Sequence, residues 1–146
     1  MADKSQLDTL KQGVKAWNEW RMQNHSIKVD LSEAELSGAN LTISDFYWAK
    51  LSGANLTKAN LRDAELLAAN FSGANCTDTD LTGAALASAD LTEVNFSRAI
   101  LSWVDLSWAD LSGAMNLTQK QIEQARGNEQ TKLPDHLAHP ASWRQS

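Results

Sequence analysis

The hydrophobic pattern of this chain repeats every five residues, which matches neither an α-helix nor a β-strand. In the segment AKLSGANLTKANLRD, Ala49, Ala54 and Ala59 stand five apart, and leucines follow two places behind them with the same interval. A helix returns to one face every ~3.6 residues and a strand every ~2. The pattern therefore predicts a different regular structure.

The pattern runs from residue 29 to residue 113 as seventeen five-residue units without insertion or deletion. We call the large apolar position of each unit its centre. A small residue stands two places before the centre, usually Asp, Asn or Glu directly before it, and usually Ser or Thr directly after it. The centres are Leu31, Leu36, Leu41, Phe46, Leu51, Leu56, Leu61, Leu66, Phe71, Cys76, Leu81, Leu86, Leu91, Phe96, Leu101, Leu106 and Leu111.

Within one unit, the small residue, the polar residue and the centre alternate in, out and in, as in a β-strand. Since a shift of one residue exchanges the two faces of a strand, an odd repeat keeps its register only if the chain turns a corner between units. The last place of a unit, where that corner is expected, holds Gly38, Gly53, Gly73, Gly83 and Gly113. Short straight pieces joined by regular corners predict a stacked coil. A helical solenoid needs repeats of about 30 residues or more and is excluded.

Segments such as SGANLTKANLRDAEL and SADLTEVNFSRAIL resemble the pentapeptide-repeat family, in particular its small bacterial members with helical flanks. The resemblance implies an all-β solenoid, a right-handed quadrilateral β-helix with four units per coil and therefore about four coils. Centres and small residues would point inward and the other three positions outward. With ~4.8 Å between coils, the rod would be about 20 Å tall.

The segments on either side of the repeat predict covers for its ends, because an open β-helix exposes unpaired backbone groups. In residues 1–28, Leu7, Leu10, Val14 and Trp17 recur at helical spacing, and Ser5 is a candidate N-cap. We interpret this segment as one amphipathic helix that serves as a cap or strap. The repeat domain then comprises residues 29–113.

Residues 114–146 predict a short helix followed by an extended tail. Thr118 and Gln121 form a capping-box pattern, and Gly127 is a candidate helix stop. The remaining residues, which include two prolines, predict a strap across the C-terminal coil.

Catalytic or metal-binding patterns are hard to find. His25, His136 and His139 all lie outside the repeat, and no serine is placed against a histidine. Cys76 is the single cysteine, so no internal disulfide can form, and its centre position predicts a core filler. From the missing catalytic and metal-binding patterns we expect a non-enzymatic protein without cofactor or metal. We also expect it to be cytoplasmic, because the sequence shows neither a signal peptide nor a membrane span.

Charge is distributed unevenly along the chain. The repeat holds twelve acidic and four basic residues, a net of −8, whereas residues 1–28 carry +2 and residues 114–146 carry +1. The family resemblance therefore suggests an alternative function, a DNA-mimicking modulator of a topoisomerase such as gyrase. Mimicry of DNA needs about one charge per 1.7 Å, and twelve acids spread over four faces are sparse. An ordinary acidic surface explains the charge more simply.

Folding the repeat at twenty residues per coil gathers large outward apolar residues on two adjacent faces. They are Ile43, Tyr47, Trp48, Leu67, Ile100, Trp103 and Trp108. Either the protein's own flanks cover them, or they form an interaction surface, since contiguous apolar patches mark such sites. We predict a protein-binding or scaffold module of unknown partner, with a homodimer as one option. We expect no direct binding to nucleic acid or membranes.

Overall fold

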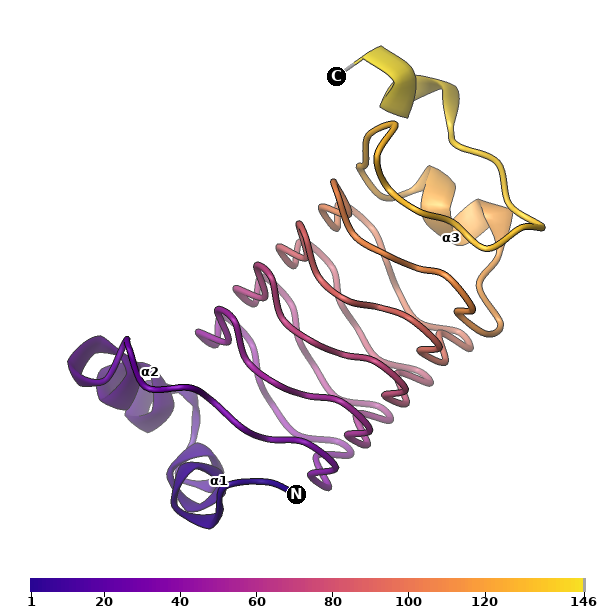
Figure 1. Cartoon of the computed structure of the whole chain (residues 1–146). Helices are drawn as coiled ribbons and strands as arrows, with labels where there is room; N and C mark the ends of the chain where they lie inside the picture. The colour runs from indigo at the N-terminus through magenta and orange to yellow at the C-terminus, as the bar shows by residue number, and fades with distance from the viewer. Residues whose placement is uncertain (146) are drawn as a thin grey trace.

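The computed structural model describes residues 1–145, which form a rod of stacked coils with helices at both ends (Figure 1). Helices α1 (Lys4–Lys11) and α2 (Val14–Gln23) precede the coils, and α3 (Gln119–Glu123) and a 3₁₀ helix (Ala141–Gln145) follow them. None of these helices combines the length and apolar character that a membrane span requires. The final residue of the predicted tail lies outside the described residues.

Parallel β-bridges hold the coils together. Asp30 pairs with Lys50, Lys50 with Asn70, and the same interval of twenty residues recurs throughout the repeat. One coil therefore contains four pentapeptides. On each face one residue, the one before the centre, forms the bridge, and the corner N–H adds a hydrogen bond to the next coil, as Glu33 does to Ser52 at 2.8 Å. These contacts fit the stacked coil that the repeat predicts.

The interior of the rod consists of the centres and the small residues, as predicted. All seventeen centres are buried, and among the small residues only Ala39 is half-buried. Phe46, Phe71 and Phe96 are buried at successive coils, and Cys76 is a small centre among them. Burial raises the pKa of the Cys76 thiol to about 12, against the weaker effect of a hydrogen bond with Thr79. The thiol is therefore core filler, as expected.

Every unit ends in a residue with left-handed backbone. The last place of all seventeen units has a φ between 55° and 72°. The N–H that follows it donates to the carbonyl of the preceding centre, as Ala54 does to Leu51 at 3.1 Å. A positive φ only at the third residue of such a turn defines type II. The predicted corners are present, and twelve of them do without glycine.

The Asp or Asn that precedes most centres has a structural role that the sequence interpretation missed. The sequence predicts only that these positions point outward and form an ordinary acidic surface. In the structure, Asn55 Oδ1 accepts hydrogen bonds from the Thr57 N–H at 3.1 Å and the Thr57 hydroxyl at 2.7 Å. Asp80 and Thr82 repeat this arrangement. The Asp or Asn and the following Ser or Thr thus brace the corner between them.

The N-terminal cap consists of two helices where one was predicted. Gly13, with a φ of 110°, separates α1 from α2. The N-cap of α1 is Asp3, whose carboxylate accepts from the Gln6 N–H, and Ser5 instead donates its hydroxyl to that carboxylate. Trp17 is fully buried, and its ring lies 5.6 Å from that of Phe46 in the first coil. The cap is thus anchored on the core.

Two amide side chains of this cap pair with the edge of the first coil. Gln6 donates to the carbonyl of Lys28 at 2.8 Å and accepts from the N–H of Asp30 at 2.7 Å. Asn18 bridges residues 43 and 45 in the same way, at 3.0 and 2.8 Å. Each amide replaces the peptide group that a preceding coil would supply.

The C-terminal cap begins with the predicted capping box of Thr118 and Gln121. The helix ends at Glu123, however, and Gly127 serves a different purpose from a helix stop. A Cβ at Gly127 would lie 2.7 Å from the buried ring of Trp143, so this glycine makes room for the tryptophan. Beyond α3 the tail runs along the last coil as an extended strap.

Candidate functional site

The corners of the β-helix place the candidate interaction surface on the outside of the rod. Ile43, Trp48, Trp103 and Trp108 all occupy the last place of a unit, with φ values of 55° to 64°. Left-handed backbone costs a non-glycine residue roughly 1–2 kcal/mol, and a β-branched residue such as Ile43 adopts it rarely. Five other corners avoid this cost with glycine. Packing inside the coil therefore gives no reason for large apolar residues here.

The protein's own flanks leave these side chains exposed. Trp48, Trp103 and Trp108 are 65%, 69% and 61% exposed. Ile43, Tyr47 and Ile100 are also exposed, and Leu67 is half-buried. The first of the two sequence interpretations, cover by the flanking segments, does not describe the tryptophans.

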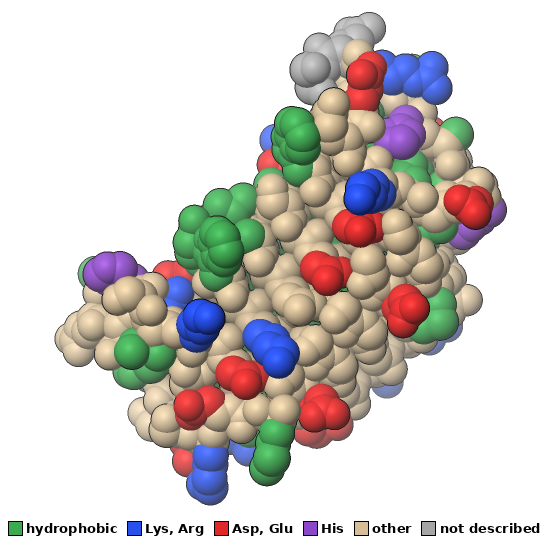
Figure 2. Space-filling model, viewed as in Figure 1, with side chains coloured by type: hydrophobic (Ala, Val, Ile, Leu, Met, Phe, Trp, Pro, Cys, Tyr) green, Lys and Arg blue, Asp and Glu red, His purple; other side chains and the backbone are tan. Residues whose placement is uncertain are grey.

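Six of the seven residues form two clusters, and the half-buried Leu67 lies between them. Ile43, Tyr47 and Trp48 lie on the first coil, whereas Ile100, Trp103 and Trp108 lie toward the last. Since the bridges repeat every twenty residues, Trp48 and Trp108 occupy the same corner three coils apart. At ~4.8 Å per coil their backbone positions are about 14 Å apart. Figure 2 shows hydrophobic side chains in separate groups along one edge of the rod.

The surface directly between Trp48 and Trp108 is low and uncharged, whereas Asp63 and Gly83 occupy the neighbouring corners between Ile43 and Trp103. Ala68 and Ser88 occupy the intervening corners between Trp48 and Trp108. The positions before those corners belong to Leu67 and Ala87, both half-buried. Small side chains between two large rings make a saddle with an uncharged floor.

The acidic residues of the repeat are partly neutralised by neighbours on adjacent coils. Arg98 binds Asp78 at 2.8 Å, and Arg62 lies 3.2 Å from Asp80. The hydrogen bond from Arg98 lowers the pKa of Asp78. Burial acts to raise the pKa of Asp80, but hydrogen bonds from Thr82 and Arg62 outweigh it and lower the value. No described corner or bridge column is acidic throughout.

The two C-terminal histidines bind backbone. His136 Nε2 lies 3.0 Å from the Leu117 carbonyl, and His139 Nε2 lies 2.7 Å from that of Thr131. Among residues 1–145, no group of three or more His, Cys, Asp or Glu side chains is placed to hold a metal ion.

Sequence reasoning missed Arg21, which supports Tyr47 from below. Its side chain is 3% exposed, and its guanidinium donates to the Tyr47 carbonyl at 3.5 Å. The signal was its position four residues after Trp17, on the same face of a helix.

Known proteins share the repeat. The family model for pentapeptide repeats matches residues 44–75 and 74–113 with eight copies. A pentapeptide repeat protein from Nostoc PCC 7120 is 30% identical, over 86% of this chain and 88% of its own, with a TM-score of 0.41. One from the thylakoid lumen of Arabidopsis thaliana is 27% identical, over 80% and 69%, with a TM-score of 0.37.

More distant is QnrB1, a plasmid-mediated fluoroquinolone resistance protein, which is 18% identical over 77% of this chain and 68% of its own, with a TM-score of 0.38. A search of curated proteins finds no match. The seventeen repeats, the match of the family model and the 30% sequence identity to the Nostoc protein agree. On these grounds the chain belongs to the pentapeptide-repeat family.

Proposed function

We propose that this chain, as a right-handed quadrilateral β-helix closed by helical flanks, is a non-enzymatic protein-binding or scaffold module. Its contact surface is the saddle with the two apolar clusters at its ends. The observation that carries the proposal is the exposure of Trp48, Trp103 and Trp108, each above three fifths. Tryptophan is among the residues that dominate binding energy at protein interfaces, and burial of one such ring removes about 150–250 Å² from water.

The dimensions of the saddle suit one secondary-structure element of a partner. The tryptophan backbones at its two ends are about 14 Å apart, and an α-helix with side chains is about 10–12 Å wide. Ala68, Ala87 and Ser88 in the floor would allow close approach. A second copy of this chain could present its own edge to the same saddle, since two-fold symmetric contacts are the commonest in homo-oligomers.

Replacing both saddle tryptophans tests the proposal. The double variant Trp48→Glu/Trp108→Glu should lose partner capture or shift the sedimentation coefficient toward the monomer, while far-ultraviolet circular dichroism stays unchanged. Lys58→Glu, an exposed corner outside the saddle, is the matched control and should behave as wild type. A wild type that is monomeric and captures the same proteins as the double variant would contradict the proposal.

DNA mimicry is the second candidate, and the net charge of −8 on the repeat favours it. The pairing of Asp78 with Arg98 and of Asp80 with Arg62 weighs against it, because mimicry needs dense unpaired charge. A gyrase supercoiling assay with the purified protein separates the two functions. Inhibition, or protection from a quinolone, would support mimicry, and an unchanged supercoiling rate would count against it.

A further inference from the structure

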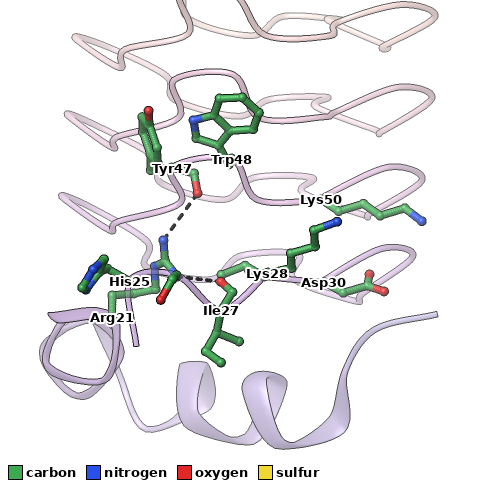
Figure 3. A pocket seen from close by; sticks show the side chains of 10 residues that line it. Arg21, His25, Ile27, Lys28, Asp30, Tyr47, Trp48 and Lys50 are labelled. Carbon is green, nitrogen blue, oxygen red and sulfur yellow. Dashed lines mark hydrogen bonds between the residues drawn. The ribbon is translucent and has the colours of Figure 1, made fainter. Parts of the chain in front are cut away.

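A pocket of about 770 Å³ opens beside the N-terminal cluster. It lies between the end of α2, the connection to the first coil and the corner that carries Tyr47 and Trp48. Figure 3 shows these two rings side by side above Arg21, with His25 on one flank and Lys28 on the other. The pocket is therefore continuous with the proposed contact surface, because Tyr47 and Trp48 belong to both.

The lining of this pocket is basic, in contrast to the acidic repeat around it. It contains Arg21, Lys28 and Lys50, and Asp30 is its one acid. Asp30 Oδ1 already accepts from the N–H and the hydroxyl of Ser32, at 3.0 and 2.6 Å. Within residues 1–145, neither lysine amine has a hydrogen-bond partner or an ion pair within 4 Å. Lys50 faces Asp30 without an ion pair, so both amines can still contact an anion at the mouth of the pocket.

Arg21 adds a fixed positive charge beneath the pocket. Its Nη1 donates to the Asn24 and Ile27 carbonyls at 3.3 and 3.2 Å, which holds the guanidinium in place. Its Nε is buried without a hydrogen bond and lies 3.8 Å from an oxygen of Asp45, too far for one. The Asp45 carboxylate nevertheless forms an ion pair with this guanidinium, which offsets much of the charge of Arg21. The attraction for an anion therefore rests on the two lysines, and Arg21 shapes the pocket floor.

The apolar part of the pocket lining indicates which kind of side chain the partner presents next to its negative charge. Trp48 and Ile27 are 65% and 50% exposed, and the ring centroids of Tyr47 and Trp48 are 5.8 Å apart in a tilted pair. These groups favour an apolar side chain next to the anion. A small inorganic anion would leave them in water.

We propose that the pocket binds an acidic segment of the protein partner, with a carboxylate at Lys28 and Lys50 and a neighbouring apolar side chain against Tyr47 and Trp48. This inference rests on the proposed protein-binding function and states which residue types the partner presents. Charge complementarity and continuity with the saddle select this occupant.

Binding of a defined peptide tests the inference. The probe is a short fluorescein-labelled peptide in which glutamate alternates with leucine and serine, and its twin carries glutamine in place of glutamate. Fluorescence anisotropy should give at least about tenfold tighter binding for the acidic probe. Lys28→Glu/Lys50→Glu should remove that preference, whereas Lys58→Glu should retain it. Glutamate occupies the place of Lys50 in other units, as at Glu35 and Glu65, so the fold should tolerate the change.

Salt provides an independent readout, because the Debye length falls from about 10 Å at 0.1 M to about 3 Å at 1 M. The acidic probe should therefore bind less tightly at high salt and its amide twin should not. Equal binding of the two probes, no binding of either, or displacement by free glutamate at the concentration of the probe would overturn the inference.

The variant Trp108→Glu separates this inference from the proposed function, since Trp108 lies three coils from the pocket. It should weaken capture of the whole partner and leave peptide binding unchanged. Lysine-dependent peptide binding together with undiminished capture by Trp103→Glu/Trp108→Glu would reject the saddle and retain the pocket, because neither of these rings lines the pocket. Capture that depends on the tryptophans, without a preference for the acidic probe, would reject the pocket and retain the saddle.

Discussion

The two ends of the rod are closed by different means. At the N-terminal end, side chains of α1 and α2 meet the first coil: Gln6 and Asn18 pair with its backbone, and the Trp17 indole donates to the Asp45 carbonyl at 2.8 Å. At the C-terminal end, the main chain itself continues the pairing. Arg126 bridges to Asp105 and Lys132 to Asp110, at intervals of 21 and 22 residues in place of twenty.

The difference shows which kind of group each cap pairs with the edge. Helix backbone satisfies most of its own hydrogen bonds, so the N-terminal cap offers the coil mainly side-chain groups, together with the Asp3 N–H, which donates to the Asp30 carbonyl at 2.8 Å. Within residues 1–145, the N–H groups of Glu35 and Asn40 on the first coil have no hydrogen-bond partner.

The extended tail pairs peptide groups with the last coil, and Gln121 fills a further face by donating to the Phe96 and Ala99 carbonyls at 2.9 Å. In the part of the chain that the structure describes, the N–H groups of Arg98, Leu101 and Gly113 on this coil also have no hydrogen-bond partner. The two caps therefore differ in the groups they use, and neither closes its edge completely.

Trp17→Ala should have the largest effect, because Trp17 is the largest side chain that the N-terminal cap buries in the core. Truncation of a buried tryptophan costs about 3–5 kcal/mol, measurable by urea unfolding. Hydrogen exchange should accelerate in the first coil and leave the pairing of Asp105 and Asp110 protected. Trp103→Ala, at an exposed corner, is the control and should stay within about 0.5 kcal/mol of wild type. Uniform loss of protection along the rod would show that the ends are not independent.

The sequence predicts the coils better than it predicts their ends. The alternation and the corners follow from local rules that repeat seventeen times. The break at Gly13 does not, because Leu10 and Trp17 continue the helical spacing across it, and only docking on the coil determines the bend. The pocket could not be predicted either, since it depends on how α2 meets Tyr47.

The sequence predicts which residues make up the candidate surface, but it does not predict whether their side chains are exposed. Counting at twenty residues per coil places Trp48 and Trp108 in one column, which the bridges confirm. The same count gives the small floor residues between them, but the exposure of the rings depends on where the flanks lie. That outcome is set by long-range contacts such as those of Asn18 with residues 43 and 45.

A pair of polar substitutions should rank the two caps by their dependence on side chains. Asn18→Ala leaves the Asp45 N–H and the Ile43 carbonyl without their amide partner, which should cost about 1–3 kcal/mol. Thr131→Val removes the hydroxyl that donates to the Leu106 carbonyl at 2.8 Å, but the neighbouring bridges remain. We expect a loss of about 1 kcal/mol there. Urea midpoints compare the two directly, and a larger loss for Thr131→Val would reverse the ranking.

The smallest expected effect is a change in the acid sensitivity of folding stability, and it involves two aspartates at equivalent places on the first and last coils. Hydrogen bonds from Ser32 lower the pKa of Asp30, and hydrogen bonds from Ser112 lower that of Asp110. A carboxyl group whose folded pKa lies below the unfolded value of about 3.9 contributes stability that is complete above that value. This stability is lost as the pH falls through the folded pKa.

Asp30→Asn and Asp110→Asn should each reduce this acid sensitivity. Asparagine keeps the Oδ1 acceptor, as Asn55 shows with Thr57, but has no proton to gain. Urea midpoints should therefore be close to wild type at neutral pH and fall less steeply below about pH 4. If the caps act only on the edges and leave the corners alone, the two variants should flatten the profile equally. Both aspartates also face cations, Lys50 and the N-terminus at Asp30 and Lys132 at Asp110. A flattening confined to Asp30 would show that the charge of the N-terminus adds to the effect of the hydrogen bonds.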